Sequence, residues 1–98
     1  MAEIVWTREA EEWLERVHNH IARDNPAAAH KVVAEIYEKI QMLRRQPRIG
    51  DPYEGVADRE VRELLYGSYR IPYLVRSESR VEILGVFHCA MDIEQYLK

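Results

Sequence analysis

The sequence predicts an α+β fold in which a helical hairpin packs on one face of an antiparallel sheet, in the order strand–helix–helix–strand–strand–strand. Two observations point to the hairpin. Apolar residues recur every three to four positions in two successive stretches before residue 45, and Asp24-Asn25-Pro26 separates these stretches. A third observation points to the sheet, because residues 59–88 are rich in β-branched and aromatic residues and are divided by short turn sequences.

The N-terminal part of the chain predicts a short strand followed by a first helix. Residues 3–6 suit the strand because they include Ile, Val and Trp. Thr7 suits the helix N-cap, and the glutamates that follow it favour the positive end of the helix dipole. The helix is expected to end near Arg23. Its apolar stripe consists of Ala10, Trp13 or Leu14, Val17 and Ile21.

A second helix is predicted to start at Asn25, a suitable N-cap, with Pro26 at the first helical position, where proline is tolerated. It ends in a basic turn before Pro47, because the residue before a proline rarely stays helical. Residues 47–58 combine prolines and glycines with few apolar residues and predict a loop. The apolar stripe of this helix consists of Ala29, Val32, Val33, Ile36, Ile40 and Leu43.

Three strands are predicted, over residues 59–66, 69–76 and 80–88. The first two are joined by Gly67-Ser68, and glycine at the first turn position suits the two-residue turns of hairpins. The third strand is apolar on both faces, which predicts a central place in the sheet. Pro72 predicts a local irregularity, since proline cannot donate to a ladder. Residues 91–97 suit either a last helical turn or an extended tail.

The composition predicts one domain over residues 1–98. Apolar residues make up 47% and charged residues 32% of the chain, as in an ordinary globular protein. No apolar run approaches the roughly 20 residues of a membrane span, and the N-terminus does not resemble a secretory signal. Cys89 is the only cysteine, which excludes an internal disulfide. We therefore expect a cytoplasmic protein with no membrane partner.

The charge of the chain limits its partners. Its formal net charge is −3, whereas nucleic-acid binders use a basic surface to neutralise phosphates. The window of residues 59–80 is the exception, because it holds five arginines and three glutamates. A small basic face is compatible with this pattern, and a general polyanion-binding surface is not.

Arg62 and Arg70 flank the predicted hairpin and could converge on one face of it. There, two guanidinium groups would suit a phosphate or a carboxylate. The alternative, which we weigh equally, is that both are solvated sheet residues. Their partners would then be the nearby acids Asp58, Glu60 or Glu63.

The histidines and the cysteine give weaker signals. His88, at the end of the last strand, could act as an acid or base near neutral pH, or could simply be a polar residue at the rim. Cys89 should point to the opposite face, which argues against a Cys/His pair. His18 and His20 lie two apart on a helix and diverge, and together with His30 they show no metal-binding spacing. We expect neither a metal nor a cofactor.

An ordered series of short motifs runs along nearly the whole chain. It begins with Ile4-Val5-Trp6-Thr7, Asp24-Asn25-Pro26-Ala27-Ala28-Ala29 and Gln46-Pro47-Arg48-Ile49-Gly50. It continues with Val61-Arg62-Glu63-Leu64, Gly67-Ser68-Tyr69-Arg70-Ile71-Pro72-Tyr73 and Val81-Glu82-Ile83-Leu84-Gly85-Val86-Phe87-His88. In these motifs the chain resembles the ParE/RelE superfamily of type II toxin–antitoxin toxins, of plasmid-stabilisation type, and is closer to ParE.

The resemblance implies a RelE/ParE-like fold and a growth-inhibiting toxin. A cognate antitoxin would neutralise it in a hetero-oligomer by laying an extended or helical segment over it. RelE-like members cut mRNA on the ribosome with several basic residues and often a C-terminal tyrosine or histidine. ParE-like members lack that set and inhibit DNA gyrase instead.

Single residues of the chain can be compared with the RelE pattern. Arg70 matches the arginine that RelE-like enzymes use around the scissile phosphate, and Arg62 lies near where further basic residues occur. After the last strand, however, this chain has Cys89-Ala90-Met91-Asp92, where many RNA-cleaving members carry arginine or lysine. Tyr96 also lies farther along the chain than the usual catalytic tyrosine.

We therefore expect a ParE-like toxin that binds DNA gyrase and has no chemistry of its own. The alternative is a RelE-like, ribosome-dependent mRNA endoribonuclease that uses Arg62, Arg70 and His88. A third possibility is a degenerate member of the family without toxicity. The residues expected to contact the target are Arg62, Tyr69, Arg70, Tyr73 and His88.

Overall fold

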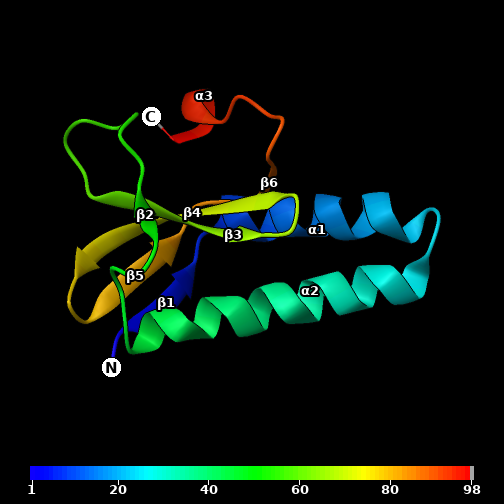
Figure 1. Cartoon of the computed structure of the whole chain (residues 1–98), viewed down its shortest axis with the longest axis horizontal. Helices are drawn as coiled ribbons and strands as arrows, with labels where there is room; N and C mark the ends of the chain where they lie inside the picture. The colour runs from blue at the N-terminus through cyan, green and yellow to red at the C-terminus, as the bar shows by residue number, and fades with distance from the viewer. Residues whose placement is uncertain (98) are drawn as a thin grey trace.

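A computed structural model describes residues 1–97 and contains a helical hairpin, a twisted sheet and a short C-terminal helix (Figure 1). The helical elements are α1 (Arg8–Ala22), α2 (Pro26–Gln41), the 3₁₀ turn η1 (Met42–Arg44) and α3 (Glu94–Leu97). The strands are β1 (Glu3–Trp6), β2 (Asp51–Pro52), β3 (Val61–Tyr66), β4 (Tyr69–Ser77), β5 (Arg80–Ile83) and β6 (Phe87–His88).

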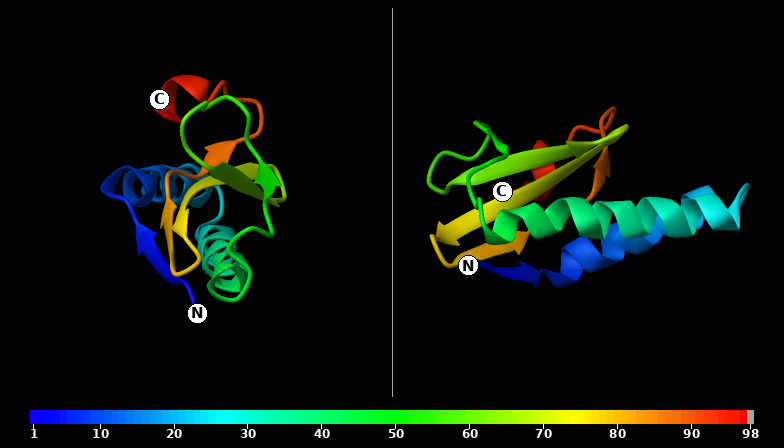
Figure 2. Two further views of the ribbon diagram at one scale, coloured as in Figure 1. Left: turned by 90° about the vertical axis from the view of Figure 1, so that its left-hand side faces the viewer. Right: turned by 60° about the horizontal axis from the view of Figure 1, so that its bottom comes forward.

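Side-chain caps fix the start of both long helices, as predicted. Thr7 Oγ1 accepts a hydrogen bond from the Ala10 N–H at 3.1 Å and donates one to the Ile83 carbonyl at 2.8 Å, so this cap also ties α1 to the sheet. Asn25 Oδ1 accepts from the Ala28 N–H at 3.0 Å. The two helices lie side by side and antiparallel (Figures 1 and 2).

The sheet confirms the predicted α+β class but is mixed rather than fully antiparallel. Its strand order is β1-β5-β4-β3-β2, with β6 pairing β4 beyond the end of β5. β1 and β5 are parallel, and the other pairs are antiparallel. The parallel pair is possible because two long helices and three strands lie between β1 and β5 in the chain, so no tight turn forces them to reverse.

The predicted strand over residues 80–88 is interrupted where it faces Pro72. β5 ends at Ile83 and β6 begins at Phe87, although both segments pair with β4 and β5 lies inside the sheet as expected. Proline has no N–H for the ladder. Its carbonyl accepts a hydrogen bond from the Leu84 N–H at 2.9 Å, after which the chain leaves the sheet and returns. The irregularity expected at Pro72 therefore falls on its partner strand.

Two further boundaries differ from the sequence prediction. The first predicted strand, 59–66, starts at Val61. The loop predicted over residues 47–58 contains β2, a short strand that pairs with the start of β3. The Gly67-Ser68 turn is as expected, because Gly67 alone among the described residues has a positive φ, at 54°.

Each face of the sheet carries its own apolar cluster. The helical hairpin covers one face, where Ile71, Tyr73 and Val75 of β4 pack against α1 and α2. The opposite face carries Leu74, which packs with the C-terminal segment. Figure 2 shows this segment on the far side of the sheet from the hairpin. The second cluster consists of Val61, Leu74, Phe87, Ile93 and Leu97.

The C-terminal segment takes the helical alternative, with α3 as a single turn. Tyr96 on this turn is 47% exposed and stacks on Phe87, with ring centroids 5.5 Å apart. None of the helices within residues 1–97 combines the length and apolar character that crossing a membrane requires.

Candidate functional site

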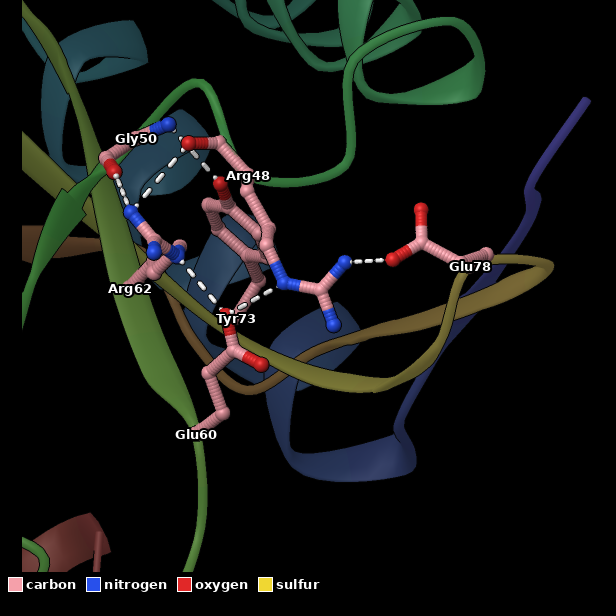
Figure 3. A network of polar contacts seen from close by, with 6 residues as sticks. All are labelled: Arg48, Gly50, Glu60, Arg62, Tyr73 and Glu78. Atoms are coloured by element: carbon pink, nitrogen blue, oxygen red, sulfur yellow. Dashed lines mark hydrogen bonds and ion pairs between the residues drawn. The ribbon is translucent and has the colours of Figure 1, made fainter.

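Arg62 on β3 holds the loop after η1 against the sheet (Figure 3). Its Nη1 donates hydrogen bonds to the carbonyl oxygens of Gly50 at 2.8 Å and Arg48 at 3.2 Å. Its Nε donates to Glu60 Oε2 at 3.0 Å. Because the Arg62 guanidinium donates to backbone carbonyls of the loop, it holds the loop in place.

Tyr73 closes the same network from the core. Its side chain is fully buried, and its hydroxyl accepts a hydrogen bond from the Gly50 N–H at 2.9 Å. Burial raises the pKa of Tyr73 above its ordinary value. A Cβ on residue 50 would lie 2.6 Å from the Glu63 carbonyl oxygen and 2.7 Å from the Tyr73 hydroxyl, so this approach requires glycine. Tyr73 thus serves packing here and presents no surface to a partner.

Arg48 extends the network to the turn between β4 and β5 (Figure 3). Its guanidinium pairs with Glu60, at 2.9 Å between Nε and Oε2, and with Glu78. Hydrogen bonds from Arg48 and then Arg62 hold the pKa of the Glu60 carboxyl below its ordinary value. The same carboxylates raise the pKa of Arg48. These contacts join three segments that are distant in sequence.

Arg70 lies on the other face of the sheet, which corrects the expectation that it converges with Arg62. In the β3–β4 ladder Arg62 pairs with Tyr73, whereas Arg70 pairs with Leu65. Because neighbouring strand residues alternate between faces, Arg62 falls on the helix-covered face and Arg70 on the opposite one. Arg70 forms an ion pair with Glu63, at 2.9 Å from its Nη2, as the alternative interpretation of the sequence held.

His88 and Tyr69 form a third location, near the tip of the β3–β4 hairpin. They are register partners, and their rings meet edge to face with centroids 5.7 Å apart. His88 Nδ1 accepts a hydrogen bond from the Ala90 N–H at 3.1 Å. In the neutral ring the hydrogen is therefore on Nε2, which can donate a hydrogen bond to another group. The next residue, Cys89, donates its N–H to the Ser68 carbonyl at 2.8 Å, which ties β6 to the turn.

Tyr69 and His88 line an open cleft between the hairpin tip and the helices. One hollow, of about 540 Å³, also includes His20 and Asp24 near the helical turn. A second, of about 230 Å³, shares Tyr69, His88 and His20 and adds five residues. These are Trp13, Arg16, Val17, Val86 and Met91. We call the combined surface the hairpin-tip cleft.

The helix α1 forms the second wall of this cleft. The Arg16 guanidinium lies over the Trp13 ring, 4.5 Å from its centroid. Trp13 also packs against Phe87, at 4.7 Å between centroids, and thereby connects the cleft to the apolar cluster under the C-terminal segment. The cleft therefore offers aromatic surface, a cation and imidazole groups, a combination that suits a protein side chain or a short peptide segment.

Sequence reasoning found Tyr69 and His88 but missed the α1 wall. Trp13, Arg16 and His20 recur at spacings of three and four, so they share one side of α1. That spacing is visible in the sequence. The sequence alone does not identify this wall, because Trp13 can equally be assigned to the apolar stripe beside Leu14 and because His20 has no metal-binding spacing that would single it out.

The candidate residues thus occupy three separate places. Arg62 and Tyr73 support a loop, Arg70 is paired on the opposite face, and Tyr69 and His88 line the cleft. The structure does not place Arg62, Arg70 and His88, the candidate set of the endoribonuclease alternative, on one face of the sheet.

Comparison with known proteins agrees with the fold and with the motif series. The family described as "ParE toxin of type II toxin-antitoxin system, parDE" matches residues 4–93. A protein of Sinorhizobium fredii (strain NBRC 101917 / NGR234), named "Putative toxin Y4kP", is 35% identical over 94 residues, which are 96% of this chain and 95% of that protein. A solved structure, "Chromosomal ParDE TA system from P. aeruginosa", has a similar fold. It superposes with a TM-score of 0.72 at 24% identity, covering 90% of this chain and 96% of that one. The chain therefore belongs to the ParE toxin family of type II toxin–antitoxin systems.

Proposed function

We propose that this toxin inhibits growth by binding DNA gyrase in the cytoplasm, and that it performs no chemistry of its own. The observation that carries the proposal is the separation of Arg62, Arg70 and His88. Cleavage of RNA through its 2′-hydroxyl needs a donor to the developing phosphate dianion, with a base and an acid beside it.

The sheet register supports this proposal, because it separates the three residues. Arg70 pairs with Phe87, and Tyr69 pairs with His88, so Arg70 and His88 point to opposite faces although they lie close along the ladder. Arg62 is on the face of His88, but it donates to the Gly50 and Arg48 carbonyls at the other end of β3. Protein binding is the function that this arrangement supports better.

We propose that gyrase contacts the hairpin-tip cleft. The cleft combines apolar and aromatic walls from Trp13 and Tyr69 with polar groups from Arg16, His20 and His88. Protein interfaces concentrate their binding energy on aromatic and arginine residues of this kind, surrounded by a polar rim. None of these side chains takes part in the Arg62 network.

We further propose that the cognate antitoxin covers the open edge of β3. β2 pairs only with Arg62 and Glu63, so within the described part of the chain residues 64–66 have no strand on that side. Leu65 is 50% exposed at this edge, and Met42 and Ile49 are exposed beside it. An extended segment that adds to the sheet would satisfy the free backbone groups and cover this apolar surface.

A supercoiling assay with purified gyrase tests the proposed target. Folded, antitoxin-free toxin is expected to inhibit supercoiling, and Tyr69→Ala should raise the half-inhibitory concentration by roughly tenfold or more, since interface aromatics commonly contribute at least 1.4 kcal/mol. Arg8→Ala is the matched control. Arg8 is 88% exposed, at the far end of α1 from the cleft, and should leave inhibition unchanged.

Two results would contradict the proposal. One is the absence of inhibition by folded toxin at micromolar concentration. The other is cleavage of mRNA in the ribosomal A site by the same preparation, abolished by Arg70→Ala. In that case the three residues would have to be rearranged on the ribosome, and the endoribonuclease alternative would replace ours.

The antitoxin contact has its own test. Titration of the toxin with the protein product of the adjacent small reading frame should give a stable complex, and Leu65→Glu should weaken it by at least tenfold through burial of an unpaired charge. Tyr69→Ala serves as the control at the other surface. Equal affinity of wild type and Leu65→Glu would exclude the β3 edge as the antitoxin site.

A further inference from the structure

His18 of α1 and His30 of α2 face one another across the helical hairpin. Their ring centroids are 5.3 Å apart, and the rings are inclined by 75°. His18 is half-buried and His30 is exposed, so water can reach both rings. Sequence reasoning considered His18 with its neighbour His20, which points elsewhere, and so missed the pair that the antiparallel helices create.

The spacing of the two rings fits coordination of a single ion. Two imidazoles bound tetrahedrally through metal–nitrogen bonds of about 2.0–2.1 Å place their ring centroids about 5 Å apart. The observed separation of 5.3 Å is close to that value, so the two rings already have the spacing that a shared ion requires.

The surroundings of His18 favour binding of a metal ion through its Nε2 atom. Its Nδ1 lies 3.1 Å from Asn19 Oδ1, an oxygen that only accepts, so Nδ1 carries the hydrogen and Nε2 keeps a free lone pair. A hydrogen bond to the second nitrogen is how proteins commonly orient metal-binding histidines. The hollow beside His18, of about 270 Å³, is also lined by Glu11 and Glu15, whose negative charge attracts a cation.

We propose that His18 and His30 bind one divalent transition-metal ion that joins α1 to α2. Imidazole ligands suit Zn²⁺, Ni²⁺ and Cu²⁺. Within residues 1–97 no group of three or more His, Cys, Asp or Glu side chains is arranged to hold a metal, so water completes the coordination shell and the site is an accessory one. Because both ligands come together only in the folded hairpin, the ion stabilises the folded state.

Calorimetric titration of tag-free wild-type toxin with ZnCl₂ and NiCl₂ tests the proposal. We expect one ion per chain, and a rise in the thermal unfolding midpoint as metal is added. His18→Gln and His30→Gln should each weaken binding by roughly tenfold or more, since removal of even the partners that orient a ligand costs 10–100-fold. His20→Gln is the matched control, on the same helix and exposed, and should bind as wild type does.

The unfolding midpoints of the variants without metal separate a binding effect from a folding defect. The proposal is supported if both glutamine variants unfold like wild type without metal and lose the metal-dependent shift. It is overturned if wild type binds no ion at millimolar concentration, or if His20→Gln weakens binding as much as His18→Gln does. If either of these two results is obtained, the His18–His30 contact is an aromatic contact only.

Discussion

The two faces of the sheet are covered in different ways. On one face, two long helices bury a large cluster that includes Ile36, Ile40 and Leu43, all fully inaccessible to solvent. On the other, a segment of a few residues ending in one helical turn buries a small cluster through Ile93 and Leu97. The hairpin side therefore holds the larger share of the buried apolar side chains. The C-terminal side, by contrast, contacts one wall of the hairpin-tip cleft, where the Tyr96 ring lies 5.0 Å from the Trp13 ring.

The largest expected effect comes from the hairpin side. Ile36→Ala should lower the free energy of unfolding by about 3–5 kcal/mol, because it removes a fully buried side chain and leaves a cavity between rigid elements. Urea unfolding followed by circular dichroism measures this loss. A loss below about 1 kcal/mol would show that the helices repack freely and that the hairpin side is not the rigid one.

Arg62 and Arg70, which lie on the two different faces of the sheet, are expected to contribute differently to the free energy of unfolding. Arg62→Gln should cost about 2 kcal/mol, since it removes charged hydrogen bonds to the Gly50 and Arg48 carbonyls. Arg70→Gln should cost about 0.5–1 kcal/mol, since it removes a partly exposed ion pair with Glu63. Urea midpoints of both variants decide the order, and a greater loss for Arg70→Gln would reverse our assignment of the supporting role.

On the C-terminal side the expected effect is smaller than its burial suggests. Leu97 is 3% exposed, but it lies on a single helical turn near the chain end, which can relax around a cavity. Leu97→Ala should therefore cost about 1–2 kcal/mol, below the value for a rigid core site. Hydrogen exchange should show faster exchange in residues 91–97 and unchanged protection in α2. Loss of protection in both would mean that the two faces unfold together.

Acid should act mainly through ion pairs outside both clusters. Hydrogen bonds from Arg76 and then Arg80 hold the pKa of the Glu82 carboxyl below its ordinary value of 4.5. Hydrogen bonds from Arg48 and then Arg62 lower the pKa of the Glu60 carboxyl in the same way. A lowered folded-state pKa means that this stabilisation is present above pH 4.5 and is lost as the pH falls through the folded-state value.

The glutamine variants Glu82→Gln and Glu60→Gln isolate this effect. The difference in urea midpoint between wild type and each variant should be largest above pH 5 and should shrink as the pH falls below 4.5. Arg8→Ala provides a control from an exposed helix pair. If the difference in urea midpoint stays constant between pH 3 and pH 6, the ion pairs of Glu82 and Glu60 with their arginines do not stabilise the folded state.

Much of the fold follows from local sequence signals, while the site depends on long-range pairing. The caps at Thr7 and Asn25 and the Gly67 turn were predictable because each is specified by neighbouring residues. The parallel β1–β5 pair was not, because no local pattern encodes a partner far along the chain. β2 was not predictable because it consists of only an aspartate and a proline, which are rare in strands. The opposite faces of Arg62 and Arg70 could have been deduced, since a two-residue turn at 67–68 already fixes which residues pair.

The affinity of purified gyrase for immobilised toxin tests the central claim most directly, namely that the toxin acts by docking through the hairpin-tip cleft. We predict that wild-type toxin and Arg70→Gln bind alike, whereas Tyr69→Ala binds at least tenfold more weakly although its circular dichroism spectrum shows that it is folded. Equal binding by all three proteins, or no binding by the wild type, would contradict the account.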